Sequence, residues 1–276
     1  MELISSDQIE AFGRDGFVVV PDLLKADELV RLGDALARAL ERRSGRRPRP
    51  PLAERSRYEQ SFNQSINLWE DDDEVRAFSF HPRVGEAAAR LLGVAAIRLW
   101  HDQALYKEAG GRPTDPHQDQ PYWPIAESDT ITAWIPLDGS SLESGAMGYV
   151  PGSHRFGVRK FVNIFGQSEP YDLVSGPESR GVEPVFVEVP RGAVAFHHGL
   201  TFHLAKPNRS ERVRRVHTMI FFRDGSTRSE KGPPHFAVDR AKIAVGQEIA
   251  SDVTPIAWPR PDGRPPSPPA ERFPFW

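Results

Sequence analysis

One short stretch of the sequence carries two side chains that could bind a metal ion together. His117 and Asp119 are separated by a single residue, Gln118. In an extended backbone, residues two apart point to the same side, so an imidazole and a carboxylate would converge on one point. That pair would form half of a site for a divalent cation. Such a tripeptide also occurs by chance, and a histidine on a strand is often only a hydrogen-bonding residue, so the pair alone leaves both interpretations open.

A third ligand has to come from elsewhere in the chain, which contains nine histidines. His203 stands at the end of an expected strand, and Pro207-Asn208 marks a turn just beyond it. We therefore expect His203 to lie near a hairpin turn, where its side chain can reach a cavity. Two imidazoles and one carboxylate on one face of a metal leave positions open for co-substrate and O₂, as in non-haem Fe(II) oxygenases. Zinc usually prefers a tetrahedral set with one open position.

Arg214 follows His203 by eleven residues, across the expected hairpin. A guanidinium there could form a two-pronged salt bridge with the far carboxylate of a dicarboxylic acid. The alternative is a surface arginine in a basic group with Arg209, Arg212 and Arg215.

Three other histidines are weaker candidates for metal ligands. His154 follows Pro-Gly-Ser and is interpreted as a structural turn residue rather than a fourth ligand. His197 and His198 are neighbours on an expected strand, so they alternate in direction and one of them could line the cavity. His203 has the better spacing to Arg214.

These residues belong to a series of motifs that resembles the phytanoyl-CoA dioxygenase family, which includes ectoine hydroxylase. The resemblance covers about residues 7–225, and five motifs in the family order are more specific than any one of them. The matching pieces are His117-Gln118-Asp119, Thr132-Ala133-Trp134, Gly145 with Val150-Pro151-Gly152-Ser153-His154, Arg191-Gly192-Ala193-Val194-Ala195-Phe196, and His203 with Asn208 and Arg214.

The resemblance implies a double-stranded β-helix, the jelly-roll or cupin-like fold, and an enzyme that uses Fe(II), 2-oxoglutarate and O₂. It assigns the iron to His117, Asp119 and His203, which are then the catalytic residues as well. It assigns the distal carboxylate of 2-oxoglutarate to Arg214. Further contacts with the co-substrate are implied for Trp134, Gln103, Thr132 and Lys107, of which Lys107 could equally be an exposed lysine on a strand.

Two positions qualify the resemblance. Ala205 stands where some relatives have a serine that contacts the co-substrate, so Thr132 or Gln103 would have to supply that hydrogen bond. Related halogenases replace the carboxylate of the triad with a small residue, and the presence of Asp119 therefore disfavours halogenation.

The substrate is less defined than the metal site. Tyr122 and Trp123, just after the triad carboxylate, could form an apolar or stacking wall, or could instead pack under a loop. Asn67 lies in a segment where relatives place residues that cover the substrate. Because no basic pocket for a CoA phosphate is evident, we expect a natural-product intermediate, an amino acid derivative or a lipid rather than an acyl-CoA.

Hydrophobic periodicity predicts the elements that must position these residues. Helices are expected from a cap at Ser5 or Ser6 through Arg14, over residues 26–43, and over residues 84–92 with Gly93 as the C-terminal cap. Strands are expected at residues 17–20, 97–107, 129–137, 147–150, 183–189, 193–198 and 214–223. Helices followed by strands at this spacing suggest an antiparallel double-sheet fold that is mainly β with flanking helices.

The chain is interpreted as a single domain, residues 1–276. It would have a helical N-terminal part at about residues 1–95, a jelly-roll core at about 96–225, and a proline-rich C-terminal extension at about 226–276. We expect the extension to wrap the surface or to cover the mouth of a pocket.

Composition excludes several classes of protein. The chain has no cysteine, so disulfides, thiolate zinc sites and iron–sulfur clusters are ruled out. The net charge of −3 gives no overall bias toward nucleic acid, and the basic group Arg42, Arg43, Arg46, Arg47 and Arg49 is interpreted as a solvated loop. Without an apolar run of membrane length or a signal peptide, we expect a cytoplasmic protein with no obligate protein partner.

The function predicted from these observations is a 2-oxoglutarate-dependent dioxygenase that hydroxylates an unactivated C–H bond of a small molecule. Two alternatives remain. One is a zinc-dependent hydrolase on the same ligands, although no HExxH-type arrangement accompanies them. The other is a jelly-roll protein that binds a metal and a dicarboxylate without turning anything over.

Overall fold

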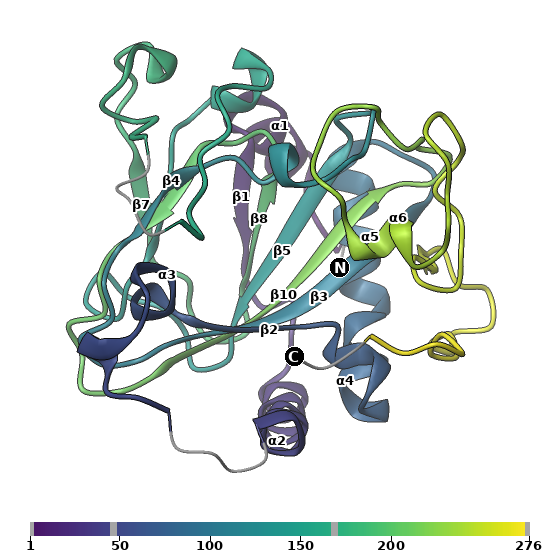
Figure 1. The fold of residues 1–276 in the computed structure, drawn as a ribbon, viewed down its shortest axis with the longest axis horizontal. Helices are drawn as coiled ribbons and strands as arrows, with labels where there is room; N and C mark the ends of the chain where they lie inside the picture. The colour runs from purple at the N-terminus through teal and green to yellow at the C-terminus, as the bar shows by residue number, and fades with distance from the viewer. Residues whose placement is uncertain (1–2, 45–48, 167–170, 274–276) are drawn as a thin grey trace.

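The computed structural model describes residues 3–44, 49–166 and 171–273, which form two antiparallel β-sheets with helices packed against the larger one (Figure 1). The helices are α1 (Ser6–Asp15), α2 (Ala26–Ser44), α3 (Arg57–Ser61), α4 (Asp73–Ser79), α5 (Pro82–Leu92) and α6 (Phe236–Asp239). The strands are β1 (Phe17–Val20), β2 (Asn63–Ile66), β3 (Ile97–Lys107), β4 (Thr114–His117), β5 (Thr130–Pro136), β6 (Met147–Tyr149), β7 (Val185–Val187), β8 (Val194–His198), β9 (His203–Ala205), β10 (Arg214–Arg223) and β11 (Ile256–Trp258).

The strand order explains how distant segments meet. The larger sheet runs β1-β8-β5-β10-β3-β11, with β2 paired to β3 outside this path. The smaller sheet runs β4-β9-β6-β7. The paired strands are antiparallel, and most neighbours come from separate parts of the sequence. The fold is mainly β, with flanking helices, and belongs to the jelly-roll class that the sequence predicts.

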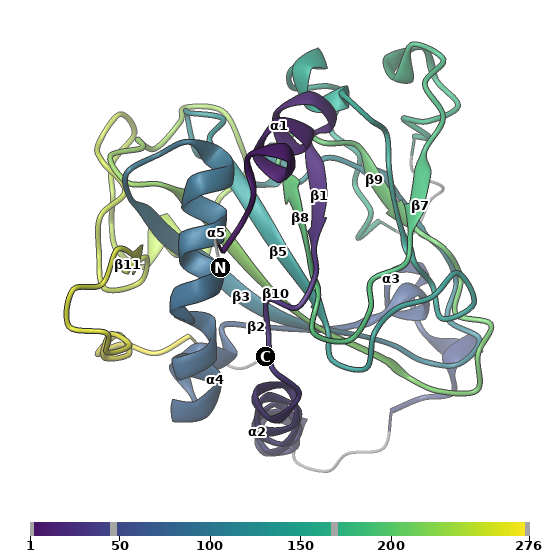
Figure 2. The same ribbon diagram turned by 180° about the vertical axis from the view of Figure 1, so that it is seen from behind.

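Side-chain alternation gives the larger sheet two different faces. On β5, Ile131 and Ile135 join the core beneath the helices, whereas Thr132 and Trp134 line a cavity on the opposite face. On β8, Phe196 belongs to the core beneath the helices, whereas His197 lines the cavity. The apolar stripes of α2 and α5 cover the first face, and Figure 2 shows these helices from behind. The helices thus bury one side of the sheet and leave the other to form a site.

A β-bulge in β3 changes the direction of its side chains. Leu99 stands opposite Phe221 of β10 and His101 stands opposite Ile220, so Trp100 is the extra residue between two paired positions. Leu99 belongs to the core beneath the helices, whereas His101, two residues later, lines the cavity. Bulges bend a strand and re-aim a side chain in this way, and they are over-represented beside active sites.

The long elements agree closely with the sequence signals. Ser5 caps α1 in a reciprocal capping box with Gln8, and Gly16 ends the helix in the left-handed region with φ 81°. Gly93 ends α5 with φ 69°. The strands predicted at residues 17–20, 97–107 and 214–223 have those bounds in the structure.

Short strands are where the prediction from the sequence is incomplete. β2, β4, β9 and β11 each have only three or four residues, too few to show a periodicity. The expected hairpin between His203 and Arg214 is wrong. β9 pairs with β4 and β6 in the smaller sheet, whereas β10 pairs with β3 and β5 in the larger one. His203 and Arg214 therefore reach one cavity from two different sheets.

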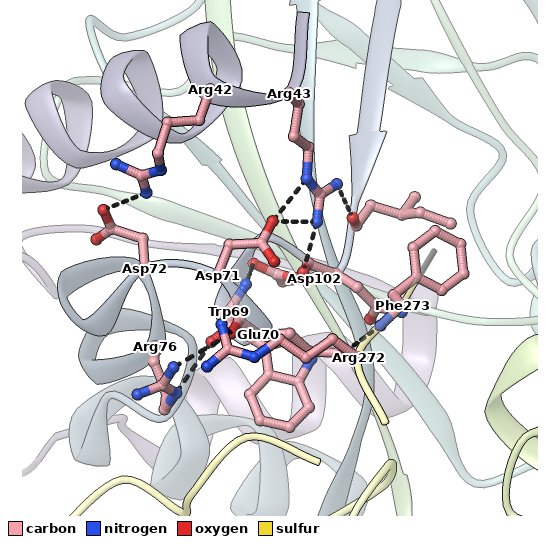
Figure 3. Close-up of polar contacts among 12 residues, drawn as sticks. Arg42, Arg43, Trp69, Glu70, Asp71, Asp72, Arg76, Asp102, Arg272 and Phe273 are labelled. Atoms are coloured by element: carbon pink, nitrogen blue, oxygen red, sulfur yellow. Dashed lines mark hydrogen bonds and ion pairs between the residues drawn. The ribbon is translucent and has the colours of Figure 1, made fainter. Parts of the chain in front are cut away.

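Part of the basic stretch at the end of α2 is held by ion pairs rather than left to solvent. Arg42 lies 2.8 Å from Asp72, and Arg43 lies 2.6 Å from Asp71, in the turn before α4 (Figure 3). Arg46 and Arg47 lie outside the described residues.

Glu70 lies in the same turn, and its buried carboxylate ties the C-terminal segment to the core. Arg240, just after α6, donates to both carboxylate oxygens at 2.8 and 3.1 Å. The backbone N–H of Phe273 donates to the same carboxylate at 2.6 Å, and Arg272 donates to the Glu70 carbonyl (Figure 3). Since Phe236 of α6 lines the cavity and packs on Phe273, Glu70 also fixes one wall of that cavity.

Removing this anchor should have a large effect on stability. Glu70→Ala leaves the guanidinium of Arg240 as an uncompensated buried charge, which we expect to cost about 3–5 kcal/mol. Glu74→Ala is the matched control, because Glu74 also pairs with an arginine, Arg38, but both side chains are about half exposed. That change should cost at most about 1 kcal/mol. Urea unfolding compares the two variants, and equal losses would contradict the anchoring role of Glu70.

Candidate active site

Three side chains of the expected metal triad meet at the inner face of the smaller sheet. His117 ends β4, His203 begins β9, and the two residues are paired in register. Asp119 Oδ1 lies 3.8 Å from His117 Nε2 and 3.6 Å from His203 Nε2. One ligand atom from each residue lies within 4.8 Å of the others, so a single ion could contact all three.

Asp119 reaches this position through a turn and not through strand alternation, which corrects the sequence-based expectation. β4 ends at His117, and Asp119 has helical dihedral angles of φ −77° and ψ −43°. The backbone N–H groups of Asp119 and Gln120 both donate to the Gly199 carbonyl, at 3.0 and 2.9 Å. A Cβ on Gly199 would lie 2.1 Å from Thr130 Oγ1, so the packing of this residue against Thr130 requires glycine.

Backbone carbonyls orient both imidazoles. His117 Nδ1 lies 2.8 Å from the Asp115 carbonyl, and His203 Nδ1 lies 3.0 Å from the Thr201 carbonyl. A carbonyl can only accept, so each Nδ1 carries the proton and each Nε2 keeps a free lone pair toward Asp119. Burial lowers the pKa of His117 and of His203 to about 4, so both rings are neutral near pH 7, the form that binds metals.

Two further side chains hold the carboxylate of Asp119. His197 Nε2 donates to Asp119 Oδ2 at 3.2 Å, and Thr132 Oγ1 donates to the same oxygen at 3.0 Å. Burial alone would raise the pKa of Asp119, but His203, His197 and His117 hold it well below its usual range. One oxygen is thus occupied by hydrogen bonds, while the other, Oδ1, faces the two imidazoles. Two nitrogen donors and one oxygen donor in this arrangement fit a ferrous ion.

His197 is not among the site residues predicted from the sequence. The sequence gives only an indirect indication of its role. The alternation of His197 and His198 placed one of them toward the cavity without saying which one. In the structure, His197 lines the cavity, whereas His198 Nδ1 accepts a backbone hydrogen bond from Leu200. His154 contacts the Gly13 carbonyl at 3.3 Å and is not part of the triad cluster, as expected for a structural residue.

Arg214 presents a buried positive charge to the same cavity. Its side chain is 4% exposed, and no carboxylate among the described residues forms an ion pair with it. Nη1 donates to the Gly145 carbonyl, the guanidinium lies 5.2 Å from the centroid of the Trp134 ring, and Nε has no partner. Burial lowers the pKa of Arg214 to about 10, so the group remains charged at neutral pH. An unpaired buried cation with a free donor fits an anionic ligand.

The spacing between the triad and Arg214 follows from β5. Thr132 contacts Asp119 and Trp134 contacts Arg214, and these two residues are neighbours on one face of the strand. Two residues along a strand span roughly 7 Å. That separation suits a short dicarboxylate with one end at the metal and the other at the guanidinium.

The remaining predicted co-substrate residues lie differently. Gln103 lines the cavity and accepts from Gln64 Nε2 at 2.5 Å. Lys107 is fully buried beside Arg214 in the strand register, but it is not among the residues that line the cavity. Its Nζ donates to the Arg112 carbonyl at 2.5 Å and contacts Thr114 Oγ1 at 3.4 Å. The structure therefore places Lys107 behind the site and not at an exposed position.

Of the three predicted substrate residues, two line the cavity and one does not. The cavity has a volume of about 480 Å³, and both Tyr122 and Trp123 line it. The hydroxyl of Tyr122 donates to the Val162 carbonyl, so this ring also supports the loop around residues 161–165. Asn67 is not among the residues that line the cavity. It is 1% exposed and has a left-handed backbone conformation, and its backbone N–H donates to the Asp102 carbonyl.

The contact from His197 generates a prediction about metal binding. His197→Leu removes the N–H that orients Asp119, and loss of such an outer hydrogen bond typically costs about 10–100-fold in metal affinity. His154→Leu is the control, since His154 is outside the triad cluster. Anaerobic titration with Fe(II) measures both variants. An unchanged affinity in His197→Leu would show that this residue does not position the carboxylate.

The buried amine of Lys107 generates a prediction about pH. Burial, together with nearby Arg214 and Arg112, lowers the pKa of Lys107 to about 6, against about 10.4 for an unfolded chain. Between these values the unfolded chain binds more protons, so folding stability should rise with pH by up to about 1.4 kcal/mol per unit. Lys107→Met should remove this slope between pH 6 and 10. Chemical unfolding at several pH values measures it, and an identical slope in the variant would contradict a neutral Lys107.

Comparison with known proteins places this geometry in a family. The family model for phytanoyl-CoA dioxygenase matches residues 12–216. The chain is similar to phytanoyl-CoA dioxygenase domain-containing protein 1 of Bos taurus, with 29% identity over 167 residues, 58% of this chain and 57% of that protein. The match thus spans little more than half the length of that relative.

Solved structures share the fold of this chain. The non-heme alpha ketoglutarate dependent carbocyclase SnoK from nogalamycin biosynthesis has a TM-score of 0.75 and 27% identity, over 92% of this chain and 96% of that chain. The epimerase SnoN, in complex with Fe3+, alpha ketoglutarate and nogalamycin RO, has a TM-score of 0.72 and 24% identity, over 91% and 97%, which shows the fold alone. Because the family model matches most of the chain, this protein belongs to the phytanoyl-CoA dioxygenase family.

Proposed function

We propose that this protein is an Fe(II)- and 2-oxoglutarate-dependent dioxygenase that hydroxylates an unactivated C–H bond of a small molecule. In the balanced reaction, substrate, O₂ and 2-oxoglutarate yield the hydroxylated product, succinate and CO₂. One oxygen atom enters the product and the other enters succinate. One observation carries the proposal: a His-Asp-His cluster with neutral imidazoles and a buried, unpaired arginine face one cavity.

The roles of the individual residues follow from their contacts. His117, Asp119 and His203 would hold the iron, with Thr132 and His197 fixing the carboxylate. Arg214 would bind the distal carboxylate of 2-oxoglutarate against the face of Trp134. Gln103 would line the path to the substrate. Lys107 is proposed only as a neighbour that supports the position of Arg214, since it does not line the cavity.

The iron, when bound, supplies the activation of O₂ that no protein side chain can perform. The protein contributes the position of the ligands and their burial, since His117 and His203 are both buried residues. Burial keeps both imidazoles neutral, and the cluster of hydrogen bonds keeps Asp119 ionised, so the ligand set is complete without rearrangement of the side chains.

Hydroxylation is the finer part of the proposal. The carbocyclase and epimerase activities named for SnoK and SnoN belong to those proteins, and they are the natural competing outcomes for this chain. Mass analysis of the product distinguishes them, because hydroxylation adds one oxygen atom and the other two outcomes add none. The cytoplasmic location remains a prediction: across residues 3–44, 49–166 and 171–273, no helix has the length and apolar character of a membrane span.

The direct test is anaerobic reconstitution with Fe(II) followed by 2-oxoglutarate. We expect the visible charge-transfer absorption that a chelated 2-oxo acid gives on Fe(II), and succinate on admission of O₂, even without substrate. Binding without any succinate would favour a non-catalytic binding protein. Activity with zinc alone would favour a hydrolase.

Two neighbouring arginines provide a matched test of the co-substrate site. Arg214→Met should weaken binding of 2-oxoglutarate by at least about 30-fold, because truncating one partner of a buried charge pair costs about 2 kcal/mol or more. Arg215→Met should leave binding unchanged, since Arg215 pairs with exposed Asp138. Titration of the charge-transfer absorption measures both. Equal affinities in the two variants would contradict the assignment of Arg214.

A further inference from the structure

The substrate end of the cavity is electrically neutral. Among the described residues that line the cavity, Asp119 and Arg214 carry the permanent charges, and the proposed function uses both of them. A charged group on the substrate would therefore enter without a partner, which is costly in a buried site. The cavity is large enough for a drug-sized molecule beside the co-substrate.

Aromatic rings form a continuous wall on one side of this space. Tyr122 contacts the rings of Phe161 and Phe165 at centroid distances of 4.8 and 5.5 Å. Phe165 contacts Tyr58 at 4.5 Å, and Tyr58 contacts Phe62 at 4.9 Å. Although all five rings line the cavity, Phe161 and Phe165 are 46% and 49% exposed. Exposed rings at a cavity mouth offer apolar surface that an aromatic ligand would cover.

Imidazole rings form a second surface of the cavity, next to the bulge in β3. The bulge turns Trp100 and His101 so that both contact His235, in the segment just before α6. The rings of His101 and His235 are nearly parallel, at 17°, with centroids 5.9 Å apart. His235 also stacks on Trp100 at 4.6 Å. Figure 1 shows α3, which carries Tyr58, to the left of the central strands and α6 to their right, so the two surfaces come from separate parts of the fold.

Polar atoms without partners lie at this imidazole surface and next to it. His101 is 6% exposed and its Nδ1 has no hydrogen-bond partner. Thr218 of β10 is 1% exposed, has an unpartnered Oγ1 and also lines the cavity. It stands opposite Gln103, two residues along β3 from His101. His235 Nδ1 accepts from the Ala237 N–H, so its Nε2 carries the ring proton and can donate. Burial lowers the pKa of His101 to about 4 and lowers that of His235, which keeps both rings uncharged.

We propose that His101, His235 and Thr218 bind a neutral hydroxyl or carbonyl group of an uncharged, largely aromatic fused-ring substrate. This inference rests on the proposed function and names the substrate class of the same site. The aromatic wall contacts the faces and edges of the ring system, while the imidazoles and the threonine hydroxyl satisfy its polar group. The same surface disfavours amino acids and other molecules that would carry a charged group into the cavity.

Three matched probes test the substrate class: phenanthrol, phenanthrene and phenanthrene carboxylate. Each is titrated into the anaerobic protein loaded with Fe(II) and 2-oxoglutarate, and binding is followed by quenching of tryptophan fluorescence. Phenanthrol should bind about tenfold more tightly than phenanthrene, because it satisfies buried polar atoms. The carboxylate should bind about tenfold or more weakly than phenanthrol. Binding of the carboxylate as tight as that of phenanthrol would overturn the proposal.

Three variants test the residues. Thr218→Val and His101→Leu remove polar atoms, and His235→Phe keeps the ring on Trp100 while removing its donor. Each should reduce the affinity for phenanthrol toward that for phenanthrene and leave phenanthrene binding unchanged. A purely structural role would weaken both probes equally. His154→Leu is the control and should change neither. If all three variants keep the full preference for phenanthrol, the proposal is wrong.

Failure of this inference can be separated from failure of the proposed function. The charge-transfer absorption forms before any probe is added and depends on the triad and Arg214. Its absence would defeat the proposed function. Its presence without the expected order of probe affinities would defeat only the assignment of the substrate class.

Discussion

The site depends on the placement of one buried carboxylate between imidazoles. Asp119 would be costly to bury alone, and three histidines and a threonine hydroxyl compensate that cost. The hydrogen bonds to Oδ2 leave Oδ1 directed at His117 and His203. The Nδ1–H group of each of these rings donates to a backbone carbonyl. The protein thus establishes the charge, tautomer and direction of each ligand before a metal arrives.

The two faces of the larger sheet explain how such a polar cluster can exist inside a stable fold. Apolar residues at alternate positions bury one face under α2 and α5, and the residues between them are free to carry polar groups. The bulge at Trp100 interrupts this alternation once and brings His101 to the polar side. Glu70 then fastens the C-terminal segment and α6 against the same side. Packing and chemistry are therefore divided between faces of one sheet.

Residue types and motif order were sufficient to predict the jelly-roll class, the long elements and the three side chains that cluster as a possible metal site, whereas predicted Lys107 and Asn67 do not line the cavity. They could not predict how those side chains meet. Asp119 is aimed by a turn around Gly199, a contact between segments far apart in the chain. Strands of three residues such as β9 carry too little periodicity to reveal their partners, which is why the expected hairpin was wrong. The contacts of His197 and Glu70 likewise depend on tertiary packing alone.

The most direct measurement is a crystal structure of the protein with iron and 2-oxoglutarate, grown without oxygen and with anomalous diffraction recorded at the iron edge. We expect one iron peak within bonding distance of His117 Nε2, Asp119 Oδ1 and His203 Nε2, and the distal carboxylate of 2-oxoglutarate on the Arg214 guanidinium. An iron bound without His203, or a carboxylate that leaves Arg214 unpaired, would contradict the proposed site.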